Sequence, residues 1–507
     1  MSVRVLPRLV VTGASGFVGR NLLEAIRDRF SIVAIGRRSP SRVGAPIHPN
    51  ITWHQLDIAD MRPLAAVFAQ LRAGGGADLL VHLAAHYDFT GEDHPDYQRT
   101  NVDGLRHVLE LSRNLGLKRF IFASSVAACR FPRPGSAIDE SAPADGEHIY
   151  ARTKRLGEAM VVQYGESFPT CIVRLAALFS DWCEYPPLYM FLRTWLGRAW
   201  NSRMLGGHGE SAVPYLHVHD AVAAVEKLLA EPDLAAPGEV FVVSPDGATS
   251  HRELYEMATR LEFGRLGVPI LVPRNLCWVG TRLRTSLARF TGEQPFERPW
   301  MARYIDKRLT VDASRTRGRL SWHPRPRLEI LRRLAFLLEN HKSHPVEWDR
   351  LNLQAMRFEA VQTNLRIYDL LERHQDEICH ALAEQLVSPR RGPRFPRYEA
   401  IPGHEHEWYS RLLLHSLMNT VRMRESALFM SHCRDLAERR MAQGFEAEEV
   451  VHALTTLNAI CLQVLAPLST PLRPEDVDAQ ISAAVQFGID SVEDVFERTP
   501  HELPADR

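Results

Sequence analysis

The sequence predicts a doubly wound parallel α/β sheet with a small substrate lobe, followed by a separate all-helical domain. Short apolar runs alternate with helical segments up to about residue 125, which is typical of βαβ units in a parallel sheet. After residue 350 the apolar spacing is purely helical. A chain of 507 residues is also too long for one ordinary domain.

The first part of the sheet follows from the alternation. The expected strands are short and almost wholly apolar, as strands that are covered on both faces are. Right-handed crossovers should place the helices on both faces of the sheet. We expect strands at 9–12, 31–36, 78–84 and 119–124, and helices at 17–30, 61–72 and 97–115.

The alternation becomes looser after residue 154, which suits a smaller lobe built from insertions. We expect a first domain over 1–345, with its substrate lobe at about 175–330, and a helical domain over 346–507. The second domain then has an ordinary domain size. Later strands are expected at 170–176 and 239–244, and helices at 219–230, 250–262 and 327–340.

Charge and cysteine content exclude several classes of protein. Lys and Arg number 61, and so do Asp and Glu, so the chain lacks the basic excess of a dedicated nucleic-acid binder. The 7 cysteines are scattered and form no Cys-x-x-Cys pair, which argues against disulfides or structural zinc and favours the cytoplasm. The apolar stretch 270–280 is interrupted by Pro273, Arg274 and Asn275, so no membrane span is expected. The basic, proline-rich loop 388–397 is the one candidate for nucleic-acid contact.

A glycine motif stands between the first strand and the first helix. Gly13 permits a tight turn, Gly16 lets the backbone approach a pyrophosphate, and Gly19 lets the helix pack closely on the strand. The helix N-terminus offers N–H groups and a partial positive charge to phosphates. The other loop positions of this predicted cofactor site are Ser15, Phe17 and Val18.

The end of the second strand indicates which cofactor binds. A carboxylate there would accept the ribose 2′-hydroxyl of NAD, but the sequence has Arg37 and Arg38 between Gly36 and Ser39. Two guanidinium groups suit a 2′-phosphate, so NADP(H) is preferred and NAD(H) stays possible. The alternative is that both arginines are solvated loop charges.

Six short motifs follow one another along the first part of the chain. They are GASGFVG at 13–19, LDIAD at 56–60, HLAA at 82–85, NVDG at 101–104, FASS at 122–125 and YARTK at 150–154. The series resembles the extended short-chain dehydrogenase/reductase family, often called NAD-dependent epimerases/dehydratases, from about residue 8 to about 340. The resemblance implies a Rossmann sheet and an enzyme that acts on a secondary alcohol or ketone.

The catalytic residues implied by the resemblance agree with elementary chemistry. Tyr150 and Lys154 are four residues apart, on one helical face. A phenol has a pKa near 10, which a neighbouring ammonium lowers. Tyr150 can then exchange a proton with the substrate oxygen. Ser125 would hydrogen-bond the same oxygen, with Ser124 as its competitor for that role, and Asn101 would support the proton path.

The resemblance also assigns the rest of the cofactor cleft. Lys154 should hold the nicotinamide ribose as well, and Asp57 should lie near the adenine amine. The remaining residues that the motifs place at the cofactor are Ile58, Leu83, Ala84, Ala85, Ser124 and Tyr150.

Departures from the family pattern disfavour one class of reaction. Val126 and Ala127 follow Ser125 where family dehydratases carry an Asp-Glu pair, so sugar dehydration is disfavoured. His86, Tyr87, Phe89 and Thr90 are candidates for substrate contact, with core and surface roles as alternatives.

The substrate class stays open between two readings. Arg193, Arg198 and Arg203 could bind the diphosphate of a nucleotide sugar. The aromatic residues of 182–200 could instead line a pocket for an apolar alcohol or ketone, or pack as core.

The helical domain loosely resembles the N-terminal sensor domains of stressosome co-antagonist proteins, over 436–460. That resemblance implies a ligand-sensing or dimerising module, with a stabilising appendage as the alternative. His404 and His406 follow Pro402-Gly403 and are expected in a solvated loop.

Two functions compete at this point. The first is an NAD(P)-dependent oxidoreductase or epimerase for a small molecule such as a nucleotide sugar, acting as a possible homodimer with no nucleic-acid partner. The second is a redox or metabolite sensor that binds cofactor and signals through the helical domain.

Overall fold

The chain divides into two compact units, Met1–Glu359 and Ala360–Arg507. The computed structural model describes residues 6–89, 91, 93–291, 297–356, 363–387, 396–423, 426–466 and 474–497. The division lies later than the expected 345/346 because helix α12 (Pro345–Met356) packs on α6 (Pro186–Trp195) and α11 (Ile330–Ser343) of the first unit.

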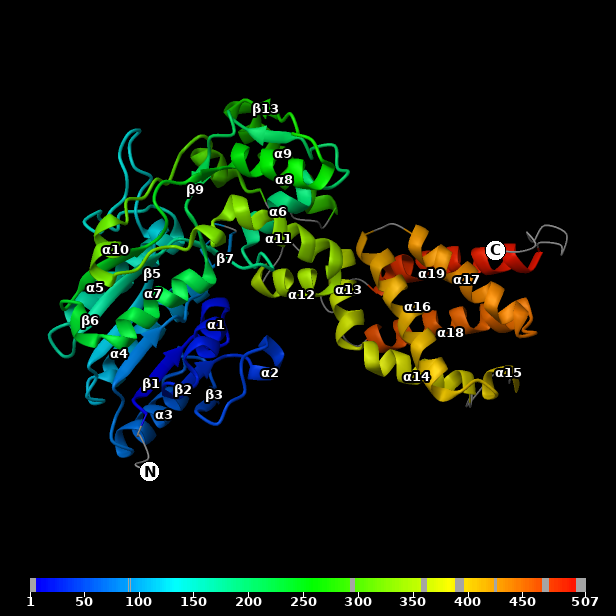
Figure 1. The fold of residues 1–507 in the computed structure, drawn as a ribbon, viewed down its shortest axis with the longest axis horizontal. Helices are drawn as coiled ribbons and strands as arrows, with labels where there is room; N and C mark the ends of the chain where they lie inside the picture. Colours follow the sequence, from blue (N-terminus) through cyan, green and yellow to red (C-terminus); the bar gives the residue numbers. More distant parts are fainter. Residues whose placement is uncertain are drawn as a thin grey trace. The chain divides into compact units, whose positions relative to one another are not determined.

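A seven-stranded parallel sheet lies at the centre of the first unit (Figure 1), which confirms the predicted fold class. The strand order is β11-β6-β5-β4-β1-β2-β3. The chain reverses its direction across the sheet between β1 and β4, and ligands of such sheets bind beside that point. The strands are β1 (Arg8–Thr12), β2 (Ser31–Gly36), β3 (Ile51–Gln55), β4 (Leu79–His82), β5 (Arg119–Ser125), β6 (Thr170–Leu175) and β11 (Glu239–Val243).

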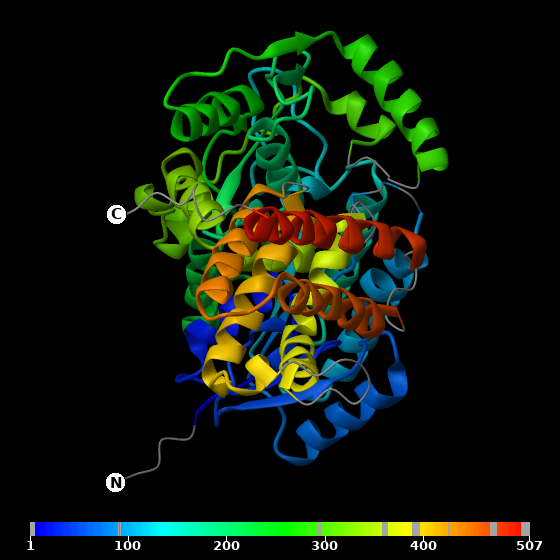
Figure 2. The same ribbon diagram turned by 90° about the vertical axis from the view of Figure 1, so that its right-hand side faces the viewer.

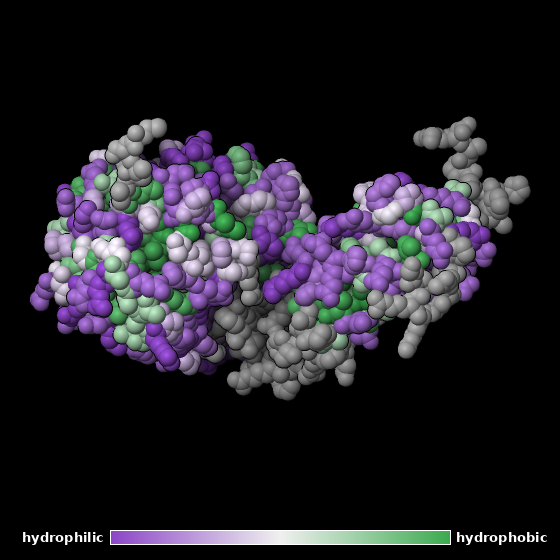
Figure 3. All heavy atoms as spheres, turned by 90° about the horizontal axis from the view of Figure 1, so that it is seen from below, coloured by the Kyte–Doolittle hydropathy of each residue, from purple (hydrophilic) through white to green (hydrophobic). Residues whose placement is uncertain are grey.

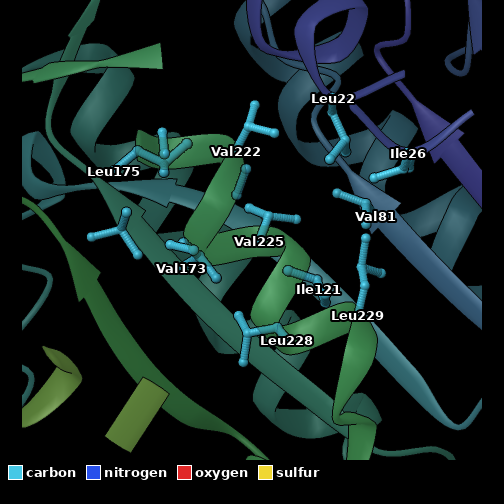
Figure 4. Close-up of a cluster of buried hydrophobic side chains, with 14 of the residues drawn as sticks. Leu22, Ile26, Val81, Ile121, Val173, Leu175, Val222, Val225, Leu228 and Leu229 are labelled. Carbon is cyan, nitrogen blue, oxygen red and sulfur yellow. The ribbon is translucent and has the colours of Figure 1, made fainter. Parts of the chain in front are cut away.

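Helices cover both faces of this sheet. On one face, α1 (Phe17–Ile26) and α7 (Val218–Ala230) pack together over the strands (Figure 4). Leu22 and Ile26 of α1 meet the buried valines and leucines of α7 there. The other face is covered by α3 (Met61–Ala73), α4 (Leu105–Ser112) and α5 (Ile149–Tyr164).

One expected helix is divided in two. Residues 97–115 were expected to form a single helix, but Tyr97–Gly104 is a π-helix, η1, and α4 continues from Leu105. Its wider turn places Asn101 and Thr100 in the interior. π-Helical turns of this kind occur often at functional sites.

The lobe of the first unit is built from short strand pairs. β7 (Ala177–Phe179) pairs with β10 (Tyr215–His217), β8 (Met204–Gly206) with β13 (Ile270–Val272), and β9 (Ala212–Val213) with β12 (Thr249–Ser250). Helix α8 (His251–Phe263) begins at a capping box made by Ser250 and Glu253. The other elements of the unit are α2 (Pro40–Val43), α9 (Arg274–Thr291), α10 (Ser314–Leu320), and the 3-10 turns η2 (Val126–Ala128), η3 (Pro232–Leu234), η4 (Pro299–Tyr304) and η5 (Pro326–Leu328).

The described part of the second unit is helical, as predicted. α19 packs against α16, α17 and α18, and a Cβ at Gly488 of α19 would lie 2.6 Å from the ring of Phe429 in α17. The helices are α13 (Thr363–Arg373), α14 (Gln375–Val387), α15 (Pro396–Glu399), α16 (Gly403–Met423), α17 (Ala427–Ala442), α18 (Ala447–Leu465) and α19 (Pro474–Glu497).

Two expectations for the second unit meet different outcomes. The solvated loop expected at His404 and His406 is wrong, because α16 begins at Gly403 and buried His406 bonds through Nε2 to the Tyr398 carbonyl at 2.7 Å. Most of the basic loop 388–397, from 388 to 395, lies outside the described residues.

Candidate active site

The glycine loop has the close approaches that its sequence suggests. Gly13 has a φ of 71°, and a Cβ there would lie 2.5 Å from the Ala84 amide nitrogen. A Cβ at Gly19 would lie 2.4 Å from the Gly13 carbonyl oxygen. Helix α1 therefore starts directly against the end of β1, and its N-cap, Gly16, brings no side chain to the N-terminus. Such a loop fits a dinucleotide pyrophosphate.

The two arginines after β2 take different positions. Arg38 lines the cavity beside the glycine loop and donates to the Ser15 carbonyl at 2.6 Å. Arg37 is more exposed and lies 3.9 Å from the Asp57 carboxylate, which also pairs with Arg99 at 3.0 Å. Arg38 is thus the arginine placed to meet a phosphate near the loop.

Tyr150, Lys154 and Ser125 lie together at the same cavity. Tyr150 and Lys154 are one turn apart on α5, and Ser125 ends β5. The Ser125 hydroxyl is close enough to Tyr150 to lower the pKa of its phenol. The Lys154 Nζ lies 5.6 Å from the Tyr150 ring centroid and donates to the Ala123 carbonyl at 2.7 Å.

Burial dominates the electrostatics of this set. It lowers the pKa of Lys154 to about 8, against the opposing influence of Glu158. It also raises the pKa of the Tyr150 phenol, while the Ser125 hydroxyl acts in the opposite direction. The phenol is therefore protonated at neutral pH and can donate a proton to a substrate oxygen.

The competing serine, Ser124, is engaged elsewhere. Its hydroxyl donates to Glu158 at 2.5 Å, and Glu158 forms a buried ion pair with Arg174 at 2.8 Å. Ser125 instead caps the turn after β5 by accepting from the Ala127 amide at 3.1 Å. The geometry favours Ser125 as the residue beside the Tyr150 hydroxyl.

Asn101 has a supporting position. From the π-helix its amide side chain accepts from the His86 amide at 2.6 Å and donates to the His86 carbonyl at 2.9 Å. It also donates to Thr153 of α5 at 3.0 Å. Asn101 thus ties the loop after β4 to the helix that carries Tyr150 and Lys154.

Only some of the remaining residues expected at the cofactor line the cavity. Leu83 and Ala85 line the cavity with the loop residues Gly13, Gly16, Phe17, Val18 and Gly19. Ile58 is buried and packs where a Cβ at Gly104 would lie 2.9 Å from it. Within the described residues, the cavity lining does not include Ser15, Arg37, Asp57, Ile58, Ala84 or Asn101.

A single cavity of about 1400 Å³ joins the glycine loop to the lobe. Beyond Tyr150 its wall is rich in aromatic and aliphatic side chains from separate parts of the chain. Those from the lobe and the segments beside it include Tyr185, Phe191, Trp195, Trp200, Met204, Leu205, Tyr215, Leu276, Leu283, Trp300, Met301, Tyr304 and Ile305.

Two of the four proposed contact residues after β4 reach this wall. Tyr87 stacks on Tyr150 with ring centroids 4.2 Å apart, and Phe89 follows at 4.5 Å from Tyr87. His86 is buried against Asn101 and Tyr97 instead, and Thr90 lies outside the described residues.

Tyr215 lies in the stretch 215–222, which resembles family positions near the substrate. It lines the cavity and is 4% exposed. Among the described residues, its hydroxyl group has no hydrogen-bond partner. A buried hydroxyl without a partner is costly unless a ligand or water supplies one. The resemblance covers the whole stretch 215–222, and the structure places Tyr215 of that stretch at the cavity.

The arginines considered for a diphosphate are not at the cavity. Arg203 donates to the Val268 carbonyl at 3.0 Å. In the described part of the chain, neither it nor Arg193 nor Arg198 is among the lining residues. The aromatics of the same stretch, in contrast, contribute four members to the wall: Tyr185, Phe191, Trp195 and Trp200.

Arg20 of α1 is connected to α12 through Glu184. Arg20, in the first turns of α1, lines the cavity and pairs with Glu184. Burial lowers the pKa of Arg20 to about 10. The Glu184 amide donates to the Asn352 side chain of α12 at 2.8 Å, and Asn352 donates to the Trp182 carbonyl at 2.8 Å.

Comparison with known proteins agrees with this geometry. Residues 9–244 match the family model described as "NAD dependent epimerase/dehydratase family". A 3 beta-hydroxysteroid dehydrogenase/Delta 5-->4-isomerase of Mycobacterium tuberculosis is 28% identical over 253 residues, which are 47% of this chain and 65% of the relative. A 3-beta-hydroxysteroid dehydrogenase of Mycolicibacterium neoaurum is 27% identical, over 47% of this chain and 66% of its own. The chain thus spans just under two thirds of the length of these relatives.

Solved structures show the same fold. The UDP-glucose 4-epimerase of Thermotoga maritima, with UDP-glucose, aligns with a TM-score of 0.51 at 18% identity, over 66% of this chain and 98% of its own. The dTDP-glucose 4,6-dehydratase of Bacillus anthracis, in complex with NAD, aligns with a TM-score of 0.51 at 18% identity, over 68% and 99%.

Proposed function

Because residues 9–244 form a domain of the NAD-dependent epimerase/dehydratase family, we propose that the protein is a nicotinamide-dependent oxidoreductase. Its reaction interconverts a secondary alcohol and a ketone on a largely apolar small molecule. The observation that carries the proposal is the convergence of Ser125, Tyr150 and Lys154 on one cavity that also contains the glycine loop.

The side chains divide the chemistry between them. The Tyr150 phenol gives a proton to the ketone oxygen, or takes one from the alcohol in the reverse direction. Ser125 hydrogen-bonds the same oxygen, and the positive charge of Lys154 favours the phenolate when the proton leaves. When bound, the nicotinamide dinucleotide supplies or accepts the hydride. Asn101 holds α5 in position through its hydrogen bond to Thr153.

NADP(H) is the cofactor that the arginines support. Arg38 lines the cavity beside the glycine loop, and a guanidinium group there suits a 2′-phosphate. The sequence at the end of β2 offers no carboxylate for a free 2′-hydroxyl.

An apolar substrate is supported by the wall of the cavity. Its aromatic and aliphatic residues suit a ligand with a hydrocarbon skeleton. The mycobacterial relatives are described as hydroxysteroid dehydrogenases, which act on a molecule of this class. Val126 and Ala127 stand where the acid-base pair of a dehydratase would be needed, so a sugar dehydration is disfavoured.

The test is turnover by purified full-length protein. Reduction of NADP⁺ and of NAD⁺ is followed with a panel of polycyclic hydroxysteroids, acyclic secondary alcohols and UDP-glucose. We expect turnover with an apolar alcohol and NADP⁺. Tyr150→Phe should lower kcat by about 10³-fold, the usual contribution of a general acid-base, with an unchanged Kd for NADPH.

Tyr164→Phe is the matched control, since Tyr164 lies on the same helix and bonds to Glu110 at the surface. It should leave kcat within twofold of the unaltered protein. Equal turnover by Tyr150→Phe would refute the assigned mechanism, and turnover confined to UDP-glucose would refute the apolar substrate.

A further inference from the structure

Exposed apolar side chains are concentrated in one segment of the lobe, residues 260–283, which we call the lobe edge. Ten of the nineteen large apolar side chains that are exposed in the described residues lie there. Val268 is 69% exposed and Leu283 60%. The others are Leu261, Phe263, Leu266, Ile270, Leu271, Leu276, Trp278 and Val279.

The lobe edge is one region of the folded unit. It runs from the end of α8 through β13 into the first turns of α9, which Figures 1 and 2 show at the same end of the unit. On the face that Figure 3 shows, apolar residues of the first unit are scattered in small groups between hydrophilic ones. A concentration of exposed apolar residues marks an interaction site.

Its charges are almost all positive. Arg260, Arg265, Arg274 and Arg282 are exposed, and the single acidic residue of the segment, Glu262, pairs with Lys342 at 2.8 Å. The Arg282 guanidinium lies 4.0 Å from the Trp278 ring centroid. Arginine and tryptophan beside exposed aliphatic residues are the composition of an interfacial helix that meets anionic lipid headgroups.

The lobe edge is also part of the cavity wall. Cys277, Gly280 and Thr281 of α9 line the cavity. Leu276 and Leu283 both line the cavity and are more than half exposed. The same helix therefore presents apolar groups to the outside and to the space that ends at Tyr150.

We propose that the lobe edge docks on an anionic lipid bilayer, so that an apolar substrate passes between the bilayer and the cavity along Leu276 and Leu283. Docking is peripheral: none of the described helices has both the length and the hydropathy needed to cross a bilayer. The arginines attract the headgroups, and the leucines, valines and Trp278 enter the interface. The substrate route rests on the proposed function, whereas docking itself needs neither cofactor nor turnover.

The experiment is co-sedimentation of the full-length protein with vesicles of phosphatidylcholine containing either no or 30 mole per cent phosphatidylglycerol. We expect binding to the anionic vesicles that weakens with salt. Arg265→Gln combined with Arg282→Gln should weaken it about 30-fold, since each basic residue near a charged surface contributes about 1 kcal/mol. Leu266→Ser combined with Val268→Ser and Val279→Ser should weaken it at least tenfold, and none of these five residues lines the cavity.

Matched controls come from elsewhere in the same unit. Arg62→Gln with Arg72→Gln removes two exposed arginines of α3, and Ile47→Ser removes an isolated exposed side chain; both should bind as the unaltered protein does. Equal binding by the lobe-edge variants, or no binding to anionic vesicles, would overturn the docking proposal. A dimer that the lobe-edge variants dissociate, measured by light scattering without lipid, would overturn it in favour of a second copy of the chain.

Turnover measurements distinguish the docking proposal from the proposed oxidoreductase function. With a water-soluble short-chain alcohol, the lobe-edge variants should keep the kcat/KM of the unaltered protein. With the apolar alcohol held in anionic vesicles they should lose it in proportion to their binding. Vesicle binding without turnover on any alcohol would leave docking standing and refute the proposed function.

Discussion

Lys154 shows what burial does to one side chain at this site. The residue is 5% exposed, and its ammonium group donates to the Ala123 carbonyl in β5. Removal from water lowers its pKa to about 8, while Glu158 one turn further along α5 works in the opposite direction. The group stays mostly protonated at neutral pH, which its part in the proposed reaction requires.

The Tyr215 side chain gives a prediction about a single residue. Because its buried hydroxyl has no partner among the described residues, we expect it to bind a polar atom of the substrate. Tyr215→Phe should raise KM about tenfold, the usual loss for one hydrogen bond, with kcat within twofold. Steady-state kinetics on the apolar alcohol measure this.

The control is another buried tyrosine of the lobe. The Tyr189 hydroxyl donates to Asp349 at 3.3 Å, so Tyr189→Phe should lower the melting temperature and leave KM unchanged. A Tyr215→Phe variant with an unchanged KM and a lower melting temperature would show that the hydroxyl serves the fold alone.

Among the elements, α12 has a position that its sequence did not indicate. It closes the first unit, and its Asn352 holds the backbone of Glu184, the ion-pair partner of Arg20 at the cofactor helix. An anionic pyrophosphate at the start of α1 would compete with Glu184 for the Arg20 guanidinium. This contact is the specific observation that favours a sensing role beside the enzymatic one.

We therefore expect NADP⁺ to change amide hydrogen exchange in α12. The rate in residues 345–356 should differ severalfold between free and NADP⁺-bound protein, and Asn352→Ala should reduce that difference. Asn340→Ala is the matched control, because Asn340 makes the same kind of bond, to the Asp181 carbonyl at 2.9 Å, from α11. If the exchange of α12 does not respond to cofactor, the coupling through Arg20 and Glu184 is refuted.

At the scale of the whole molecule, the two units each have a buried core of their own. Each should then unfold in its own cooperative transition in a calorimetric scan. NADP⁺ at about 100 times its Kd stabilises the unit that binds it by about 2.7 kcal/mol. For a unit of this size that corresponds to a rise of roughly 4 °C in melting temperature.

The unfolding transition of the helical unit distinguishes an appendage from a sensor. If the helical unit is an appendage, its melting temperature should not change with cofactor. A rise in both transitions would support the sensing hypothesis, and a single transition that moves as a whole would contradict independent unfolding.

Sequence patterns predicted six of the seven strands of the central sheet, because most of these strands are nearly continuous apolar runs. The edge strand β3 was missed, because ITWHQ is only partly apolar and partly buried. β1, β4, β5 and β6 are buried along almost their whole length and coincide closely with the expected ranges. The lobe was not predicted in detail, because its strands have two or three residues and pair across long separations, as β8 does with β13. The π-helix was missed because its only large apolar residues are Tyr97 and Val102, too few to reveal a change in the number of residues per turn.

The sequence by itself determined six of the seven strands and the glycine loop, since these depend on local periodicity and fixed spacings. Its resemblance to a known family supplied the candidate set Ser125, Tyr150 and Lys154. Only the tertiary structure distinguished Arg37 from Arg38, and it supported the choice of Ser125 over Ser124, because the partners Ser15 and Glu158 come from other elements. It alone also brought α9 to the cavity. Positions of that kind are fixed by packing between distant segments, and a local pattern holds no record of such contacts.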